Sequence, residues 1–140
     1  MTLFYETVHV INRQDYTKEQ VEAWAPKVMD LKTWDASLMN SFAFIVEIGD
    51  VIVGFGDIDE TGYLDRLYVH KDYQGLGIGT RLTEILENYA SLNQFQKITT
   101  HASITARPFF EKRGYRVLKE QQVNCRGVWM TNFVMCYVIE

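Results

Sequence analysis

Gln74-Gly75-Leu76-Gly77-Ile78-Gly79-Thr80 is the stretch of this chain that decides the fold. Its glycines alternate with other residues, between an apolar strand-like segment over residues 63–69 and a helix-like segment over residues 78–91. Glycine leaves the backbone N–H groups uncovered, and a helix that begins here turns the positive end of its dipole toward the same turn. The stretch therefore predicts a site where backbone amides bind phosphate groups.

The apolar pattern on either side of this turn predicts an α+β domain with a mixed sheet and flanking helices. We expect strands over residues 42–47, 51–58, 63–69, 97–102, 115–123 and 129–139. We expect helices over residues 2–11, 17–24, 27–39, 78–91 and 106–112.

Two local patterns refine this prediction. Thr17, with Gln20 three residues later, is typical of a capping box at the start of a helix. In the strand over residues 63–69, alternation is expected to put Asp65, Leu67 and Val69 on one face, opposite Arg66 and Tyr68.

Composition limits the class of protein. The 140 residues, of which 47% are hydrophobic and 2 are proline, fit one globular domain over residues 1–140. A net charge of −4 argues against a nucleic-acid partner. The sequence has neither an apolar run of about 18 residues, which a membrane span needs, nor the basic start of a signal peptide. Cys125 and Cys136 fit no metal-binding spacing, so we expect no metal and reduced thiols in a cytoplasmic protein.

Two well-known glycine loops do not fit the stretch. A Walker loop needs lysine and then serine or threonine directly after its last glycine, but Thr80 and Arg81 follow Gly79 here. A dinucleotide-binding loop needs the spacing G-x-G-x-x-G inside a β-α-β unit, whereas this chain has G-x-G-x-G after a run of hairpin strands.

Gln74, Gly77 and Gly79 resemble the coenzyme A loop of the GNAT N-acetyltransferase superfamily, which reads Arg or Gln, two residues, Gly, one residue, then Gly or Ala. Residues 67–69 (Leu-Tyr-Val) are similar to the Leu-x-Val of the superfamily's fourth strand. Residues 106–115 are similar to its Ala-x-x-Phe-Tyr-x-x-x-Gly-Phe segment. The three matches occur in the right order and cover roughly residues 42–139.

A closer resemblance is to the YafP-like branch of this superfamily. It is carried by residues 22–25 (Glu-Ala-Trp-Ala), 101–110 and 125–133. The resemblance implies a GNAT fold whose mixed, mostly antiparallel sheet splays between the fourth and fifth family strands, here residues 63–69 and 97–102.

The first family strand is expected to be absent, because the sequence begins within the first helix. Its loss would make residues 42–47 an edge strand. We expect that edge either to be short or to be covered by a partner chain, as in a homodimer.

The resemblance also implies the chemistry. Acetyl-CoA would be the cosubstrate, and its acetyl group would pass directly, in a ternary complex, to a primary amine of a small molecule or peptide. The residues expected to contact the coenzyme are Leu67, Tyr68, Val69, Gln74, Gly75, Leu76, Gly77, Ile78, Gly79, Thr80, Ser103 and Phe110. The backbone N–H of Tyr68 or Val69 is the candidate donor to the tetrahedral oxyanion, and Lys71 and Arg81 are candidates to offset phosphate charge.

The chain departs from the family pattern at Phe110 and Ser103. Many relatives have at the first position a tyrosine thought to protonate the leaving thiolate, which a phenyl ring cannot do. Many have asparagine at the second. A thiol of pKa about 8.5 is already a fair leaving group, so transfer can proceed without the tyrosine.

Asp65 and His101 are the candidate general bases, because both are expected beside the thioester, and a chain of water molecules is the alternative. Trp24, Trp34 and Trp129 are candidates to line the acceptor pocket, as is Tyr16. Core packing is the competing interpretation for each of these aromatic residues.

Two other functions stay open at this stage. One is a non-catalytic module that binds or senses acyl-CoA, which the phenylalanine at position 110 favours. The other is an interaction module that is active only with a partner completing the sheet edge.

Overall fold

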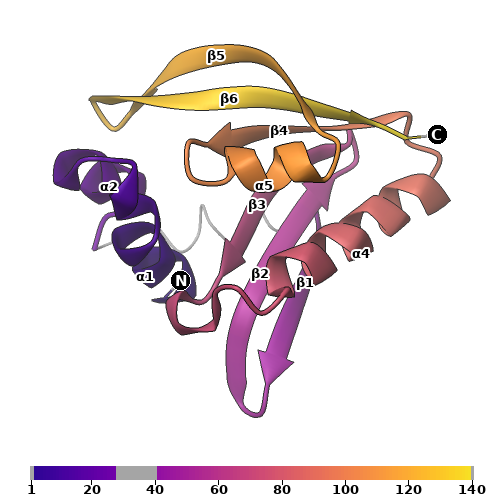
Figure 1. Cartoon of the computed structure of the whole chain (residues 1–140), viewed down its shortest axis with the longest axis horizontal. Helices are drawn as coiled ribbons and strands as arrows, with labels where there is room; N and C mark the ends of the chain where they lie inside the picture. The colour runs from indigo at the N-terminus through magenta and orange to yellow at the C-terminus, as the bar shows by residue number, and fades with distance from the viewer. Residues whose placement is uncertain (1, 28–40, 140) are drawn as a thin grey trace.

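The computed structural model describes residues 2–27 and 41–139, and in this part of the chain it contains one six-stranded sheet (Figure 1). The strands are β1 (Ser41–Ile48), β2 (Val51–Asp59), β3 (Tyr63–Val69), β4 (Lys97–Ser103), β5 (Arg116–Cys125) and β6 (Val128–Val138). They lie in the order β1-β2-β3-β4-β6-β5, and every neighbouring pair is antiparallel except β3 and β4. The predicted mixed, mostly antiparallel sheet is therefore confirmed.

The described helices are α1 (Thr2–Val10), α2 (Lys18–Trp24), α4 (Ile78–Leu92) and α5 (Arg107–Lys112). The predicted capping box is confirmed at the start of α2, where Thr17 Oγ1 accepts from the Gln20 N–H at 3.1 Å and Gln20 Oε1 accepts from the Thr17 N–H at 2.9 Å. The helix predicted over residues 27–39 lies almost entirely outside the described residues.

The helices cover both faces of the sheet. α4 and α5 pack on one face, where Leu86 and Phe110 share a core cluster with residues of β2, β3, β4 and β6. α1 and α2 pack on the other face, against the aromatic rings of Phe55 and Tyr68. Alternating glycines in β2 let α4 come close, since a Cβ at Gly54 would lie 2.8 Å from Ile78 Cγ2.

The alternation predicted for β3 is wrong at one residue. Asp57 pairs with Arg66, but the next residue of β2, Ile58, pairs with Leu64, so that Asp65 has no residue opposite it. This extra residue is a β-bulge, which interrupts the alternation of side chains. Leu64, rather than Asp65, consequently joins Leu67 in the core beneath α4.

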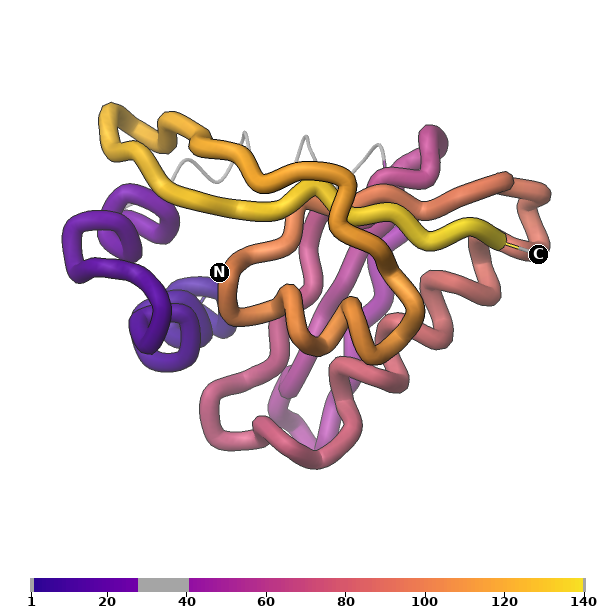
Figure 2. The backbone as a smooth tube through the Cα atoms, turned by 45° about the horizontal axis from the view of Figure 1, so that its top comes forward, coloured from indigo at the N-terminus to yellow at the C-terminus, as the bar shows by residue number. Residues whose placement is uncertain are grey.

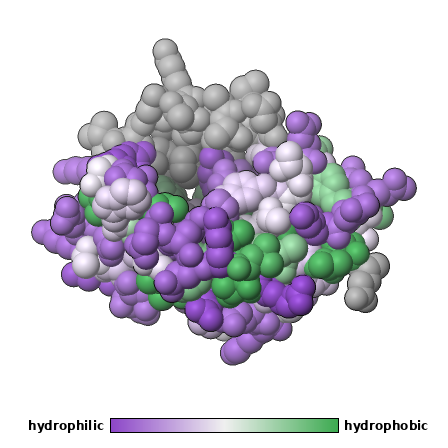
Figure 3. All heavy atoms as spheres, turned by 90° about the horizontal axis from the view of Figure 1, so that it is seen from above, coloured by the Kyte–Doolittle hydropathy of each residue, from purple (hydrophilic) through white to green (hydrophobic). Residues whose placement is uncertain are grey.

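The two edges of the sheet differ in character. Among the described strands, β1 lies at one edge of the sheet, as predicted. It is eight residues long and exposes Phe42, Ile45 and Ile48, so the alternative that this edge is short is wrong. The opposite edge strand, β5, exposes the charged side chains of Lys119 and Glu120. Figure 3 views the molecule from above relative to Figure 1, and this face is mostly hydrophilic with a smaller apolar area. Charges of this kind protect an edge from pairing with other chains, and β1 exposes fewer of them.

Among the described helices, none combines the length and apolar character that crossing a membrane requires.

Candidate active site

An opening between β3 and β4 forms a cavity lined by residues of the glycine turn and of both strands. The two strands pair only at Tyr63 with Thr99 and at Leu64 with Thr100, and then run apart (Figures 1 and 2). The Thr100 hydroxyl donates to the Leu64 carbonyl at 2.8 Å, which satisfies this carbonyl where the pairing ends. The cavity in this opening measures about 330 Å³. The predicted splay of the sheet is thus confirmed.

The cavity lining brings together most of the predicted site residues. It includes every predicted coenzyme contact except Leu76, and also Asp65, His101 and Trp24. The Leu76 side chain is exposed, so only its backbone belongs to the turn. Trp129 is 60% exposed and does not line the cavity, and Trp34 lies outside the described residues.

Other lining residues were not predicted from the sequence, and they include Thr7, Ile11, Asn12, Tyr73, Thr105 and Phe109. Tyr73 and Phe109 each lie next to a recognised motif, so their position in the sequence was a usable signal. Thr7, Ile11 and Asn12 reach the cavity only because α1 packs across β3, and no sequence pattern indicates that contact.

The β3 backbone presents one edge to the opening. The His70 N–H donates to the Val53 carbonyl of β2 at 2.7 Å, and Tyr68 lies opposite Phe55 in the same ladder. Backbone groups of alternate residues point the same way in a strand, so those of Tyr68 also point toward β2. Those of Leu67 and Val69 point toward the opening. Of the two candidate oxyanion donors, the geometry therefore favours the Val69 N–H over that of Tyr68.

The glycine turn directs further backbone amides at the same cavity. Gly75 and Gly77 have φ angles of 75° and 83°, a left-handed conformation that glycine adopts without strain. Gly77 is the N-cap of α4, whose first hydrogen bond runs from the Arg81 N–H to the Gly77 carbonyl at 3.0 Å. The N–H groups of Ile78, Gly79 and Thr80 consequently have no acceptor within the helix. All three residues line the cavity at the positive end of the helix dipole.

The carbonyl of Val69 joins three parts of the site. It accepts hydrogen bonds from Gln74 Nε2 at 2.7 Å and from Thr7 Oγ1 of α1 at 3.0 Å. The Gln74 side chain thus fastens the glycine turn to the end of β3, while Thr7 fastens α1 to the same point. Gln74 shapes the turn through this contact.

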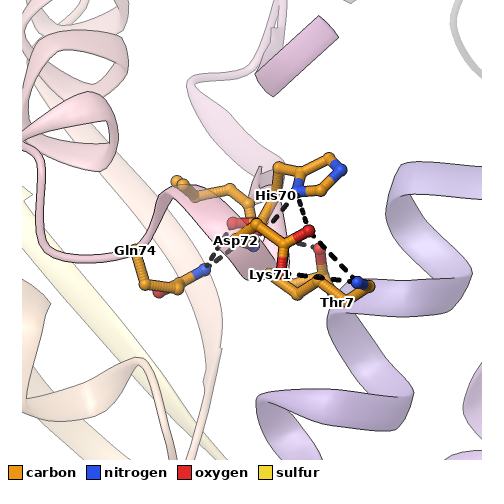
Figure 4. Close-up of polar contacts among 6 residues, drawn as sticks. Thr7, His70, Lys71, Asp72 and Gln74 are labelled. Atoms are coloured by element: carbon orange, nitrogen blue, oxygen red, sulfur yellow. Dashed lines mark hydrogen bonds and ion pairs between the residues drawn. The ribbon is translucent and has the colours of Figure 1, made fainter. Parts of the chain in front are cut away.

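The two cations predicted to offset phosphate charge each lie beside a carboxylate. Lys71 Nζ lies 3.2 Å from Asp72 Oδ2, a pair that Figure 4 shows. Arg81 Nη1 lies 3.6 Å from Glu84 Oε2 on α4, and both side chains are largely exposed. Exposed pairs of this kind are weak, so a bound phosphate can compete for either cation.

The other end of the cavity carries acidic and aromatic side chains. Asp65 and His101 both line it, and the His101 ring centroid lies 5.2 Å from that of Tyr63. Burial raises the pKa of Tyr63 to about 12, and the nearby carboxylates of Asp65, Asp59 and Asp57 add to the rise. The Arg66 guanidinium opposes this rise.

Trp24, the last residue of α2, forms part of the wall on the α1 side of the cavity. The end of this helix is tied to the turn between β5 and β6, because Arg126 Nη1 donates to the carbonyls of Ala23 at 2.7 Å and Trp24 at 3.3 Å. Tyr16 packs edge-on against Trp24, and its hydroxyl donates to the Thr131 carbonyl at 2.7 Å.

Ser103 and Phe110, the two departures from the family pattern, both line the cavity. Ser103 Oγ accepts from the Ala106 N–H at 3.0 Å and from Asn12 Nδ2 at 3.4 Å. The Phe110 ring is 3% exposed and packs against Phe109. Position 110 therefore contributes an apolar wall without a proton donor.

Comparisons with known proteins agree with this geometry. The family model of the acetyltransferase (GNAT) domain matches residues 12–136. The chain belongs to the GNAT acetyltransferase family. It is 36% identical to the uncharacterized N-acetyltransferase YafP of Escherichia coli (strain K12) over 135 residues, which cover 96% of this chain and 85% of YafP. The predicted YafP-like relationship is thereby confirmed.

Solved structures of GNAT proteins share the fold. A GCN5-related N-acetyltransferase (aminotransferase, class-II) from Rhodopseudomonas palustris superposes with a TM-score of 0.94 at 33% identity, covering 99% of this chain and 86% of that one. The PaiA N-acetyltransferase of Thermoplasma acidophilum, solved in complex with coenzyme A, superposes with a TM-score of 0.75 at 16% identity, covering 99% and 89% of the two chains. The predicted GNAT fold and the acetyltransferase class of this chain are therefore confirmed.

Proposed function

We propose that this GNAT protein transfers the acetyl group of acetyl-CoA to a primary amine of a small molecule or peptide, directly and within a ternary complex. One observation carries the proposal. The edge of β3 that has left β4 and the unpaired amides at the start of α4 line the same cavity, where they are suited to the two ends of one long ligand.

The donor would lie along the opening of the sheet. The N–H groups of Ile78, Gly79 and Thr80 suit the diphosphate of coenzyme A, with the Thr80 hydroxyl as a further donor. The backbone edge at Leu67 and Val69 suits the pantetheine arm and its thioester, which would pair with β3 as an added strand does. The Val69 carbonyl already accepts from Gln74 and Thr7, so the groups available on this edge are those of Leu67 and the Val69 N–H. PaiA, which shares the fold, was crystallised with coenzyme A.

At the thioester, the Val69 N–H would stabilise the oxyanion that forms when the amine attacks. The carbonyl π bond opens as the new C–N bond forms. Collapse of this intermediate breaks the C–S bond and releases the thiolate. The buried Phe110 ring offers no proton, so the thiolate would leave unaided or take a proton from water.

The amine must be neutral to attack, and a lysine-like amine has a pKa of about 10.4. Asp65 and His101 lie at the end of the cavity where the amine would enter, so either is placed to accept its proton, directly or through water. The Asp65 side chain, which lines the cavity, would attract the protonated amine before it reacts. Trp24 would line the path of its carbon skeleton.

We place this reaction in the cytoplasm. Cys125 and Cys136 are both unpaired thiols, a state that reducing compartments maintain.

Calorimetric titration with coenzyme A, followed by a thiol-release assay with acetyl-CoA and a panel of polyamines, aminoglycosides, amino acids and peptides, tests the proposal. We expect saturable binding and amine-dependent thiol release. Failure to bind coenzyme A would refute the donor assignment. Binding without turnover on any amine would support the second candidate, an acyl-CoA-binding sensor or interaction module, which the absence of a proton donor at Phe110 favours.

The choice between the two candidate bases can be tested in the same assay. One of the two variants Asp65→Asn and His101→Gln should remove the base. We expect that variant to lower kcat by roughly 100-fold or more, with no change in the Kd for coenzyme A. If both variants keep near wild-type turnover, a chain of water molecules acts as the base.

A further inference from the structure

The β-bulge in β3 lies at the point where the strand leaves β4. The last pair between these strands is Leu64 with Thr100, and the bulge follows at once, because Asp65 has no opposite residue in β2. A bulge bends its strand and increases the local twist. It therefore sets the direction in which Leu67 and Val69, the backbone edge assigned above to the coenzyme arm, enter the cavity.

Asp57 of β2 holds this bulge. The N–H groups of His70 and Tyr68 point toward β2, and that of Arg66, two residues earlier, has the same orientation. The Arg66 N–H, however, donates to the side chain of Asp57, at 2.9 Å from Oδ1. A carboxylate oxygen thus takes a place that a backbone carbonyl has in a regular ladder.

The same carboxylate also binds the Arg66 side chain. Arg66 Nη1 donates to Asp57 Oδ2 at 2.8 Å, and the Ser41 hydroxyl donates to that oxygen at 3.1 Å. Asp57 is fully buried, and burial raises the pKa of its carboxyl while the Arg66 guanidinium opposes the rise. Removing Arg66 alone would accordingly favour a neutral carboxyl, and removing Asp57 alone would leave a largely buried guanidinium without its closest carboxylate.

We propose that Asp57 is a positioning residue for acetyl transfer: by holding the Arg66 N–H at the bulge, it fixes the angle at which the open edge of β3 meets the pantetheine arm of coenzyme A. This inference rests on the proposed function. It predicts that substitution of Asp57 weakens binding of the pantetheine arm and leaves binding of the diphosphate end, which contacts the glycine turn, unchanged. A buried ion pair that served stability alone would make no such distinction between the two ends.

The experiment compares two double variants in the full chain. Asp57→Asn with Arg66→Met keeps an oxygen that can accept from the backbone N–H of residue 66. Asp57→Val with Arg66→Met fills a similar volume but offers no acceptor. Both lack the ion pair and both avoid an unpaired buried charge, so they differ mainly in the backbone contact.

The probes are coenzyme A and ADP, because ADP carries the adenosine and the diphosphate without the pantetheine arm. We measure both Kd values by calorimetry well below the melting temperature of each variant. We expect the Val variant to bind coenzyme A roughly fivefold more weakly than the Asn variant, the equivalent of one net hydrogen bond, with ADP affinities equal within about twofold.

Equal coenzyme A affinities for the two variants would overturn the inference, as would coenzyme A and ADP affinities that fall by the same factor. If the Val variant does not fold, Asp57→Ala with Arg66→Met replaces it under the same criteria. A wild-type protein that does not bind coenzyme A would refute the proposed function instead, so the two failures are distinguishable.

Discussion

Replacing Gly77 by alanine should weaken coenzyme binding by an amount that the backbone geometry sets. Gly77 has a φ of 83°, and a Cβ there would meet no atom within 4 Å, so the substitution introduces strain without a clash. A left-handed conformation costs a residue with a Cβ about 1–2 kcal/mol. Because an added Cβ would make no contact that holds residue 77 in this conformation, we expect the turn to relax in the free protein. Coenzyme A would then have to restore the turn, and its Kd should rise roughly 5- to 30-fold.

The chain offers a matched control at Gly127, in the turn between β5 and β6. Its φ is 85°, and a Cβ there also has no neighbour within 4 Å, but the residue does not line the cavity. Gly127→Ala should therefore carry similar strain with an unchanged Kd for coenzyme A. Calorimetric titration gives the Kd values, and thermal unfolding shows that both variants fold. An unchanged Kd for Gly77→Ala, or equal weakening by Gly127→Ala, would refute the assignment of the glycine turn as the diphosphate site.

Three further predictions concern stability and assembly. Gly54→Ala should destabilise the fold by about 1–3 kcal/mol in urea unfolding, because the new Cβ would lie 2.8 Å from Ile78 Cγ2 and 3.0 Å from Leu82 Cδ1; unchanged stability would mean that α4 has room to shift. The pKa of Tyr63 is raised from 10.0 to about 12, so the free energy of unfolding should fall as the pH rises through that interval, because the phenol ionises first in the unfolded chain. Tyr63→Phe should lessen this loss of stability, and identical pH profiles of the two proteins would contradict the shift. If β1 forms the predicted homodimer, light scattering should give about twice the chain mass of 16.3 kDa, and Ile45→Lys should give the single mass; a wild-type protein with the single mass would contradict the dimer.

The sequence was sufficient to predict local backbone features wherever a few consecutive residues determine them. The glycine turn could be recognised because left-handed backbone and bare amides require glycine at fixed positions, and the structure has left-handed φ angles at Gly75 and Gly77. The capping box at Thr17 is likewise a property of four consecutive residues, so no tertiary contact was needed to predict it.

The remainder of the site depends on contacts between distant segments. The bulge at Asp65 was missed because residues 63–69 alternate regularly, and only pairing with β2 reveals the extra residue. Asp57 gave no signal of its own, since a carboxylate in a strand is usually exposed; its burial follows from the Arg66 side chain that reaches it. Thr7 entered the site only through the packing of α1 on β3.

The contact between Arg126 and the end of α2 has a consequence for how acceptor preference could change during evolution or engineering. A segment from the start of the chain carries Trp24, which lines the cavity, and a hairpin near the end of the chain supports that segment, because the Arg126 guanidinium binds the Ala23 and Trp24 carbonyls. A chimera that receives the first helices of a relative without that relative's last hairpin would lose this contact and expose helix carbonyls. The two segments should therefore be exchanged as one unit, while the glycine turn between them in sequence can stay in place.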